Sequence, residues 1–282
     1  MGWAARVLLS GFCAALLSAS AFAGSPKLVS LDFCADQFAL ALADDEQIIA
    51  LSPDAAEAFS FYRDRAAGKP TFDGSAEDIL LMAPDLALRS YWGDARALDL
   101  IRRNGTEVVN ATYGGTLDYI YDNLRGVGEA IGQPQRAASL VAAYERRLAT
   151  LQSHEPNGLR AAYVTLSGFS SGQDTFVNEA IELAGFSTIA RELGETGWGP
   201  IPLEAFVLNP PDVLIAGFYD LETAKRVGWS RSRHPRFGAM LDGIPAIYVP
   251  SRYLSCNGFF FIDAAEYIRE EAIRLGLIAE GE

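Results

Sequence analysis

Histidine, cysteine and positive charge are scarce in this chain, and each scarcity argues against a class of function. The 282 residues include two histidines and three cysteines, whereas sites for zinc and similar metals draw on clusters of these side chains. Lysine and arginine number 23 against 36 acidic residues, a formal net charge of −13. An acidic surface repels phosphate backbones and anionic lipid headgroups. The composition therefore argues against a receptor for bare metal ions, a nucleic-acid partner and a peripheral membrane protein.

The motifs of several enzyme classes are also missing. No G-x-G-x-x-G follows a predicted strand, and the chain has no phosphate-binding loop. His154 is expected at the end of a helix and His234 precedes a proline in a loop, so neither is placed as a catalytic base. The segment 167–172 contains glycine but resembles a binding loop more than the sharp turn that carries a nucleophilic serine. We therefore expect no enzymatic activity, no catalytic residue, no metal ligand and no cofactor.

Long apolar runs are absent except at the N-terminus. Arg6 precedes an apolar run over residues 7–21, and Ala21-Phe22-Ala23 has the small-x-small pattern that signal peptidase recognises. The run is too short and too rich in serine and alanine for a membrane span of about 20 residues. Residues 1–23 are therefore predicted to be a cleaved signal peptide, and the mature chain from Gly24 is expected to be a soluble monomer in the periplasm.

Apolar strands alternate with helical patterns along the rest of the chain. This alternation is typical of parallel sheets built from βαβ units. The predicted strands are residues 27–31, 47–51, 85–88, 106–110, 160–166, 212–216 and 246–249. The predicted helices include residues 35–42, 75–82, 94–104 and 178–184. The fold class is therefore α/β, with mostly parallel sheets in Rossmann-like lobes.

One segment in mid-chain breaks this alternation. From Pro134 to Ser153 the apolar residues recur at three-and-four spacing, with charged residues on the other faces. Proline suits the first helical turn, and about 20 residues at 1.5 Å each give a helix of roughly 30 Å. Residues 133–156 are therefore predicted to be a long helix that joins an N-terminal lobe (24–132) to a C-terminal lobe (157–282).

A short internal repeat indicates that the two lobes are similar. Glu77 is followed after six residues by Pro84-Asp85 and an apolar strand, and Glu204 is followed at the same distance by Pro211-Asp212 and another strand. Proline ends a helix because it excludes the preceding residue from the α region, and the aspartate can hydrogen-bond within the turn. Each copy is therefore predicted to run from a helix start, through a turn, into a buried strand.

Taken in order, these features resemble the iron-siderophore and cobalamin periplasmic binding proteins that serve ATP-driven importers. The resemblance is carried by residues 27–31, the two Glu-to-Pro-Asp segments, the run Gly126-Val127-Gly128-Glu129-Ala130-Ile131-Gly132 and residues 175–186. It implies the class III architecture, in which one backbone helix joins two lobes and the ligand binds in the cleft between them. It also implies capture of a metal chelate, a ferric siderophore or cobalamin, and its delivery to an ABC permease dimer in the inner membrane.

The loops expected around such a cleft are rich in aromatic residues. Ligands of open α/β sheets bind beyond the carboxyl ends of the strands. Aromatic rings bury much area there, and arginines can pair bidentately with carboxylates or metal-bound oxygens. Trp198 stands six residues before Glu204, where the cobalamin-binding relatives place an aromatic wall. The predicted ligand-binding residues are Phe33, Arg89, Tyr91, Trp92, Tyr113, Phe169, Trp198, Tyr219, Arg252 and Tyr253.

Two pairs of residues, with one member in each lobe, carry further predictions. By the resemblance, Glu77 and Glu204 on the lobe tips pair with permease arginines, although an acid in a first helical turn also complements the helix dipole. Cys34 and Cys256 fall in strand-end loops and are a disulfide candidate in an oxidising compartment. The alternative is a pair of buried thiols. A bridge would join the lobes beside the ligand, which departs from the usual pattern of the family.

Several alternatives share this architecture. A haem receptor would use a tyrosine as axial ligand, a zinc or manganese receptor would need more histidines, and a sensor of the same fold or an exported enzyme would need no transporter. Cleft arginines favour an anionic ferric chelate over a neutral corrinoid, unless they pair with Asp32, Asp36 or Asp73. The candidate axial ligands are Tyr91, Tyr113, Tyr219 and Tyr253.

Overall fold

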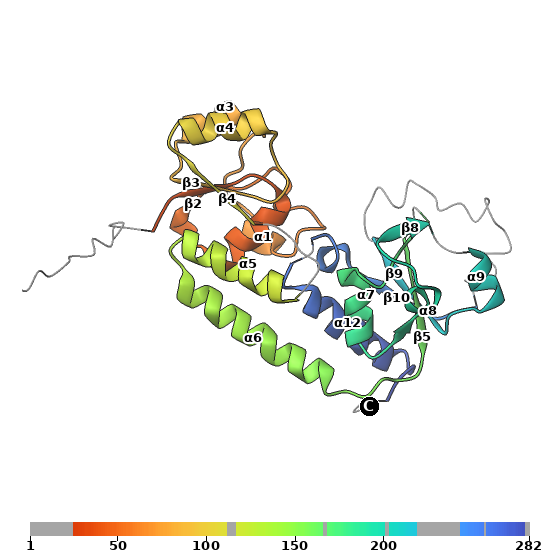
Figure 1. Ribbon diagram of the computed structural model, residues 1–282. Helices are drawn as coiled ribbons and strands as arrows, with labels where there is room; N and C mark the ends of the chain where they lie inside the picture. Colours follow the sequence, from red (N-terminus) through yellow and green to blue (C-terminus); the bar gives the residue numbers. More distant parts are fainter. Residues whose placement is uncertain are drawn as a thin grey trace, which may run out of the picture.

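The computed structural model describes residues 25–111, 117–165, 168–200, 203–218, 243–256 and 258–279. The predicted signal peptide, Tyr113 and Tyr219 lie outside these residues. Two four-stranded parallel sheets, one on each side of helix α6 (Pro134–Gln152) in the sequence, form two lobes, and α6 runs along both of them (Figure 1). The α/β class with two lobes is confirmed. In the part of the chain described, no helix is both long enough and apolar enough to cross a bilayer.

The N-terminal sheet has the strand order β2-β1-β3-β4, with every neighbouring pair parallel. Three of its four short strands are mostly buried, whereas the edge strand has polar, exposed ends. The strands are β1 (Leu28–Ser30), β2 (Ile48–Ala50), β3 (Leu86–Arg89) and β4 (Glu107–Asn110). The helices are α1 (Phe33–Leu42), η1 (Asp45–Gln47), α2 (Arg63–Ala66), α3 (Ala76–Met82), α4 (Ala95–Arg103) and α5 (Leu117–Ala130).

The C-terminal sheet has the strand order β10-β9-β5-β7, again parallel throughout, and a separate antiparallel pair joins β6 to β8. The strands are β5 (Arg160–Thr165), β6 (Phe169–Ser171), β7 (Ser187–Thr188), β8 (Trp198–Pro200), β9 (Val213–Gly217) and β10 (Ala246–Val249). The helices are α7 (Phe176–Leu183), α8 (Ile189–Leu193), α9 (Leu203–Leu208), η2 (Ser251–Tyr253) and α12 (Phe261–Arg274). All seven predicted strands are present, each within one residue of its predicted ends.

The aspartate of each repeated Pro-Asp turn makes the same hydrogen bond in its lobe. The carboxylate of Asp85 accepts from the backbone N–H of Lys27 at 2.8 Å, just before β1. The carboxylate of Asp212 accepts from the backbone N–H of Arg160, also at 2.8 Å, at the start of β5. Each Pro-Asp turn therefore fixes the start of a central strand in its sheet, and the prediction of similar lobes is confirmed at this level.

A cluster of aromatic rings connects the two lobes. The ring of Phe259 contacts Phe38 of α1 at 5.7 Å and Tyr144 of α6 at 5.2 Å between centroids. Phe61 of the N-terminal lobe stacks on Phe260 of the C-terminal lobe at 4.6 Å. Such ring pairs contribute about 0.5–1.5 kcal/mol each beyond the area they bury. These rings belong to the largest hydrophobic cluster of the described residues, which includes side chains of both lobes and of α6.

Helix α6 is held to the C-terminal lobe by partly buried polar contacts. The guanidinium of Arg147 pairs with the carboxylates of Asp263 and Glu266 on α12, and the hydroxyl of Tyr144 donates to Asp263 at 2.8 Å. Hydrogen bonding to Glu266 raises the pKa of Arg147 above its ordinary value. Breaking such a partly buried network leaves uncompensated charge, so these contacts fix the angle between α6 and α12.

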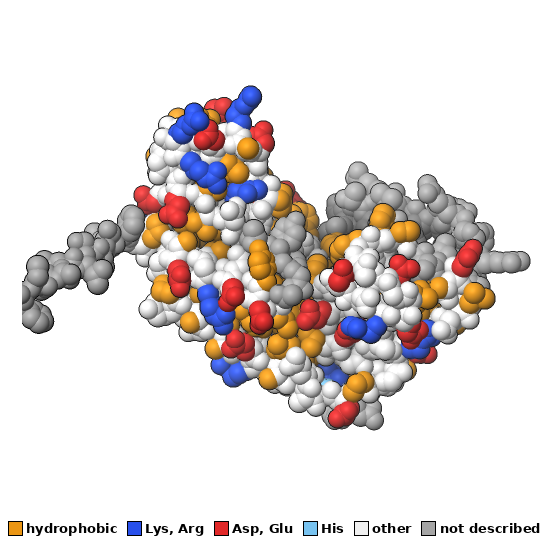
Figure 2. Space-filling model, viewed as in Figure 1, with side chains coloured by type: hydrophobic (Ala, Val, Ile, Leu, Met, Phe, Trp, Pro, Cys, Tyr) orange, Lys and Arg blue, Asp and Glu red, His pale blue; other side chains and the backbone are white. Residues whose placement is uncertain are grey.

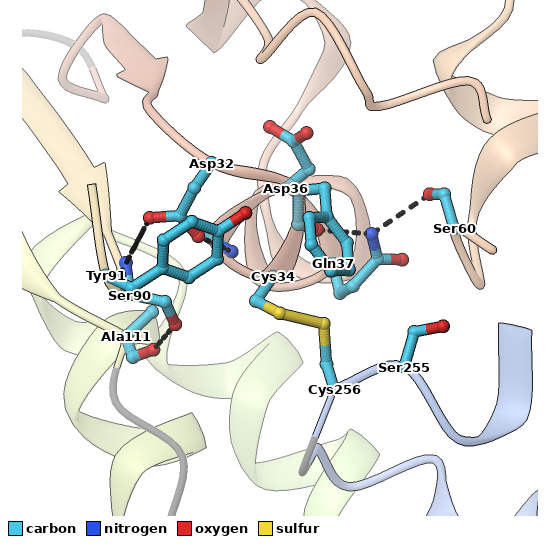
Figure 3. The surroundings of a disulfide bond; sticks show 12 residues. Asp32, Cys34, Asp36, Gln37, Ser60, Ser90, Tyr91, Ala111, Ser255 and Cys256 are labelled. Atoms are coloured by element: carbon cyan, nitrogen blue, oxygen red, sulfur yellow. Dashed lines mark hydrogen bonds between the residues drawn. A yellow bond between two sulfur atoms is a disulfide. The ribbon is translucent and has the colours of Figure 1, made fainter. Parts of the chain in front are cut away.

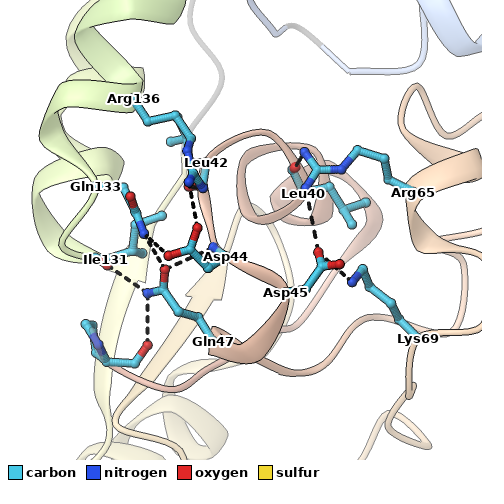
Figure 4. Close-up of polar contacts among 11 residues, drawn as sticks. Leu40, Leu42, Asp44, Asp45, Gln47, Arg65, Lys69, Ile131, Gln133 and Arg136 are labelled. Carbon is cyan, nitrogen blue, oxygen red and sulfur yellow. Dashed lines mark hydrogen bonds and ion pairs between the residues drawn. The ribbon is translucent and has the colours of Figure 1, made fainter. Parts of the chain in front are cut away.

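The start of α6 is held to the N-terminal lobe in the same way. The guanidinium of Arg136 donates to Asp44 at 2.6 Å, and the side-chain amide of Gln133 donates to the same carboxylate at 2.9 Å (Figure 4). The Arg136 hydrogen bond lowers the pKa of Asp44. Gln47 donates to the carbonyl of Ile131 at 2.9 Å, just before the helix begins. Both lobes are therefore anchored to one rigid helix.

Candidate ligand-binding site

A pocket of about 490 Å³ lies between the lobes and takes its lining from both. This volume is within the range of about 300–1,000 Å³ that is usual for small-molecule sites. The surface of the molecule is hollowed between the lobes, and hydrophobic side chains gather on the described walls of the hollow (Figure 2). The lining side chains that bear on ligand binding are Phe33, Tyr91, Asp174, Phe176, Trp198, Phe218 and the pair Cys34 and Cys256.

The carboxylate of Asp32 builds the N-terminal wall of the pocket. One oxygen caps α1 by accepting from the backbone N–H of Ala35 at 3.0 Å. The other accepts from the backbone N–H groups of Ser90 at 2.7 Å and of Tyr91 and Trp92 at 3.0 Å each (Figure 3). Because a buried carboxylate needs such donors, Asp32 fixes the turn after β3 against the start of α1.

This turn brings Tyr91 beside Phe33. Their rings meet edge to face with centroids 5.9 Å apart, and Phe33 also contacts Phe59 at 4.9 Å. The ring of Tyr91 remains half exposed toward the pocket. Burial, with a further contribution from the Asp32 charge, raises the pKa of Tyr91 well above its ordinary value. The side chain therefore presents a neutral phenol that can stack and hydrogen-bond.

Trp198 of β8 provides the opposite wall. Its indole is about half exposed and contacts the edge of Tyr163 at 5.9 Å and the ring of Phe176 at 6.5 Å. The loop before β8 passes so close to Gly172 that a Cβ atom there would lie 2.5 Å from the backbone of Thr196. Only glycine allows this approach, and it places Trp198 at the mouth of the pocket.

A disulfide joins Cys34 to Cys256 in the pocket wall (Figure 3). The two Cα atoms are 5.7 Å apart, and the residues are separated by 222 positions in the sequence. Cys34 lies in the first turn of α1, and Cys256 lies between η2 and α12. The bridge therefore links the lobes covalently beside the space in which a ligand would bind, as expected for the paired alternative.

Asp36, two residues after Cys34 in α1, is fully buried. Its carboxylate accepts from the backbone N–H of Ser52 at 3.1 Å and from the Ser52 hydroxyl at 2.6 Å. Burial raises the pKa of Asp36 to about 7, although the hydrogen bonds from Ser52 oppose this shift. Asp36 is therefore a group whose charge changes near neutral pH behind the pocket wall.

Comparison with known proteins assigns this architecture to a family. The sequence matches the family described as "Periplasmic binding protein" over residues 65–226, which is more than half of the chain. The chain belongs to this family.

Relatives within the family are distant. The chain is 25% identical over 190 residues to the uncharacterized ABC transporter substrate-binding lipoprotein YvrC of Bacillus subtilis, covering 63% of this chain and 60% of that protein. It is 24% identical over 202 residues to a cobalamin-binding protein of Halobacterium salinarum, covering 68% and 53%. The chain thus spans little more than half the length of these curated relatives.

Solved structures agree on the fold. The periplasmic haem-binding protein HutB of Vibrio cholerae superposes with a TM-score of 0.71 at 20% identity, covering 87% of this chain and 98% of that structure. At this identity the likeness concerns the fold of the periplasmic binding protein family and carries no assignment of ligand.

The two predicted arginines make contacts within the protein. Arg89 donates to the carbonyl of Trp92 at 2.6 Å and to the side chain of Asn110 at 2.9 Å. Arg252 stacks over the ring of Tyr253, with 4.6 Å to its centroid, and donates to its hydroxyl at 3.1 Å. Neither belongs to the described lining of the pocket, and neither pairs with Asp32, Asp36 or Asp73 in the contacts of the described residues.

Three predicted aromatic residues also lie outside the described lining. Trp92 contacts Phe72 at 6.2 Å and packs on the apolar cluster of the N-terminal lobe. Tyr253 packs against Phe61 and Tyr267. Phe169 belongs to strand β6, which corrects the expectation that it lies in a loop, and its ring is about half exposed. Of the described candidates, Phe33, Tyr91 and Trp198 share the pocket.

Sequence reasoning missed Phe176, Phe218 and Asp174. Phe176 stands in the first turn of α7, where a helical phenylalanine is easily taken for core. Phe218 follows β9 with a φ of +63°, an uncommon conformation for a non-glycine residue. Asp174 accepts from the backbone N–H of Gly197 and is the one charged side chain in the described lining. Among the described residues no group of three His, Cys, Asp or Glu could hold a metal ion.

Glu77 and Glu204 lie where the sequence predicts, in the first turns of α3 and α9. Both side chains are exposed. The two helices lie in different lobes, each at the part of its lobe that is far from α6 (Figure 1). The hydroxyl of Ser75 caps α3 by accepting from the backbone N–H of Asp78 at 3.0 Å.

Proposed function

We propose that the protein is the substrate-binding component of an ABC importer, exported to the periplasm by residues 1–23. It captures a metal chelate, a ferric siderophore or cobalamin, in the pocket between the lobes and delivers it to the permease dimer. The observation that carries the proposal is that rings from both lobes, Phe33 and Tyr91 on one side and Phe176 and Trp198 on the other, line one pocket of about 490 Å³. The proposal requires no cofactor and no chemical step.

The pocket suits a bulky and largely apolar ligand. Aromatic walls bury large areas at low cost in conformational entropy. Since helix α6, the aromatic cluster and the disulfide all connect the lobes, the walls are held in place before the ligand arrives. Preorganisation of this kind reduces the entropic cost of binding.

The choice between the two chelate classes depends on charge. Arg89 and Arg252 both have partners within the protein, so they no longer favour an anionic ferric chelate over a neutral corrinoid. The cobalamin-binding relative supports a corrinoid, and Asp174 in the lining is compatible with a neutral or cationic ligand. Both classes therefore enter the test.

Calorimetric titration of the mature protein with ferric siderophores, cobalamin, haem and zinc tests the proposal. One chelate should bind with micromolar or tighter affinity, and Trp198→Ala should weaken it by about tenfold or more because an aromatic wall is lost. Trp198→Phe keeps a ring and should retain most of the affinity. Arg252→Ala, outside the described lining, should change the affinity little. Binding of zinc alone, or no binding at all, would contradict the proposal.

Charge reversal at the lobe tips tests delivery. Glu77→Arg combined with Glu204→Arg should abolish uptake of the chelate by cells, because like charges would face the permease arginines. Ligand affinity should stay unchanged, since neither residue belongs to the described lining of the pocket. The matched control reverses Glu145, an exposed acid on α6, and should leave uptake intact. Normal uptake by the Glu77 and Glu204 double variant would remove these residues from the docking surface.

A further inference from the structure

Helices α3 and α9, which form the tips of the two lobes far from α6 (Figure 1), each carry an exposed leucine. Leu81 of α3 is 84% exposed and Leu208 of α9 is 85% exposed, whereas the next most exposed large hydrophobic residue in the described chain, Tyr248, reaches 58%. Each leucine stands four residues after a glutamate, Glu77 or Glu204. Residues four apart lie next to each other on one helix face. Each tip therefore presents a carboxylate and an isobutyl group side by side.

The packing of α3 and α9 turns the face that carries the glutamate and the leucine toward solvent. The residue two positions after the glutamate is Ile79 in α3 and Phe206 in α9, and these side chains are 0% and 1% exposed. Residues two apart point to nearly opposite sides of a helix. Because Ile79 and Phe206 are anchored in the cores of their lobes, both leucines must point away from the protein.

The repetition gives these leucines a meaning that a single exposed leucine lacks. Scattered apolar residues are normal on protein surfaces. Here the acid, the buried anchor and the exposed leucine recur in the same register in two lobes of different sequence. The same surface element at both ends of the molecule fits a partner with two equivalent sites.

We propose that Leu81 and Leu208 are apolar anchors of the permease contact. Each inserts into an apolar pocket that lies beside the cationic group that receives the neighbouring glutamate. The inference rests on the proposed function and extends it to the composition of both docking sites. A second copy of this chain is a poor occupant, because each tip would bring a glutamate against an acidic protein of net charge −13.

Site-specific photo-crosslinking in cells tests the partner. A photoreactive phenylalanine analogue placed at position 81 or at position 208 should crosslink to the same permease subunit, identified by mass spectrometry. The matched controls are positions 193 and 275, where Leu193 at the end of α8 and Leu275 just after α12 are 45% and 40% exposed, and they should not crosslink to it. Crosslinks to a second copy of the chain, equal crosslinking from the control positions, or none to a permease would overturn the inference.

The importer identified by crosslinking is then purified without a crosslink and placed in nanodiscs. Its affinity for variants of the protein measures how much each leucine contributes to binding. Leu81→Ser and Leu208→Ser should each weaken binding by about tenfold, the effect of leaving one leucine unburied. The double variant should lose about a hundredfold, because the tips are far apart and their effects should add. Leu193→Ser and Leu275→Ser should bind like the original protein. Titration with cyanocobalamin and a ferric hydroxamate should be the same for all variants.

The outcomes separate this inference from the proposed function. If the unaltered protein binds the importer and the Glu77 and Glu204 variants lose binding while the leucine variants keep it, the leucines are not anchors and the proposed function stands. If the unaltered protein binds neither an importer nor any chelate, the proposed function fails and the inference fails with it.

Discussion

Replacing both Cys34 and Cys256 with serine should lower the free energy of unfolding by about 3–5 kcal/mol. The bridge closes a loop of more than 200 residues, and in the chain-entropy account the stabilisation by a disulfide grows with loop length toward about 5 kcal/mol. Because one hydrophobic cluster runs through both lobes, urea unfolding should remain a single transition with a lower midpoint.

Reduction provides the control for this prediction. The original protein in dithiothreitol should unfold at the midpoint of the double-serine variant, and dithiothreitol should leave that variant unchanged. If all four samples unfold at the same midpoint, the cross-link does not contribute to stability. The variant also separates the two connections between the lobes beside the pocket. It lacks the disulfide but keeps Phe259 and Phe61, whose rings contact Phe38 and Phe260.

Replacing Asp36 with asparagine should change the pH dependence of stability. The pKa of Asp36 is raised from 3.8 to about 7 in the folded protein. Between these two values the unfolded chain has released a proton that the folded protein retains, so stability falls as the pH rises from about 4 to about 7. The difference of about three pH units corresponds to roughly 4 kcal/mol. Asparagine does not titrate and has no such loss.

Urea unfolding at pH 4.5 and pH 8 measures this effect. Relative to the original protein, Asp36→Asn should gain about 3 kcal/mol between the two conditions, because pH 4.5 to pH 7 covers about 2.5 of the three pH units. Asp44→Asn is the matched control, because Arg136 lowers the pKa of that exposed carboxyl. The stability that Asp44 contributes is present above the ordinary aspartate pKa and is lost only in more acidic solution. The difference in unfolding free energy between Asp44→Asn and the original protein should therefore be the same at pH 4.5 and at pH 8. An equally flat result for Asp36 would show that this carboxyl ionises normally.

Elements with a strong local signal were predictable from the sequence. Most of the seven strands contain runs of buried apolar residues, and α6 has apolar positions at helical spacing between Pro134 and the segment Pro156-Asn157-Gly158. The pair β6 and β8 was missed because each strand has three residues, including serine, glycine or proline, and alternation cannot register over so short a run.

The residues that line the pocket were only partly predictable. A side chain lines the pocket only if it points into it, and its position at the end of a strand does not determine this. Phe33, Tyr91 and Trp198 could be placed at strand ends and do line the pocket. Arg89 sits at an equally suitable place, but its acceptor is the carbonyl of Trp92, in a turn that Asp32 holds through three backbone hydrogen bonds. That arrangement depends on contacts 58–60 positions apart, which no local pattern contains.

The firm connection between the lobes has a consequence for the proposed docking on a permease, because it affects how the protein would be released. Helix α6, the Phe61–Phe260 stack and the disulfide hold the two tips at one separation. When one tip of a rigid body releases, the other keeps it within reach, and the effective concentration for rebinding is high. A receptor of this kind can combine two individually weak contacts into a long residence time. A partner that changes the spacing of its own two sites would weaken both contacts together and so eject the receptor.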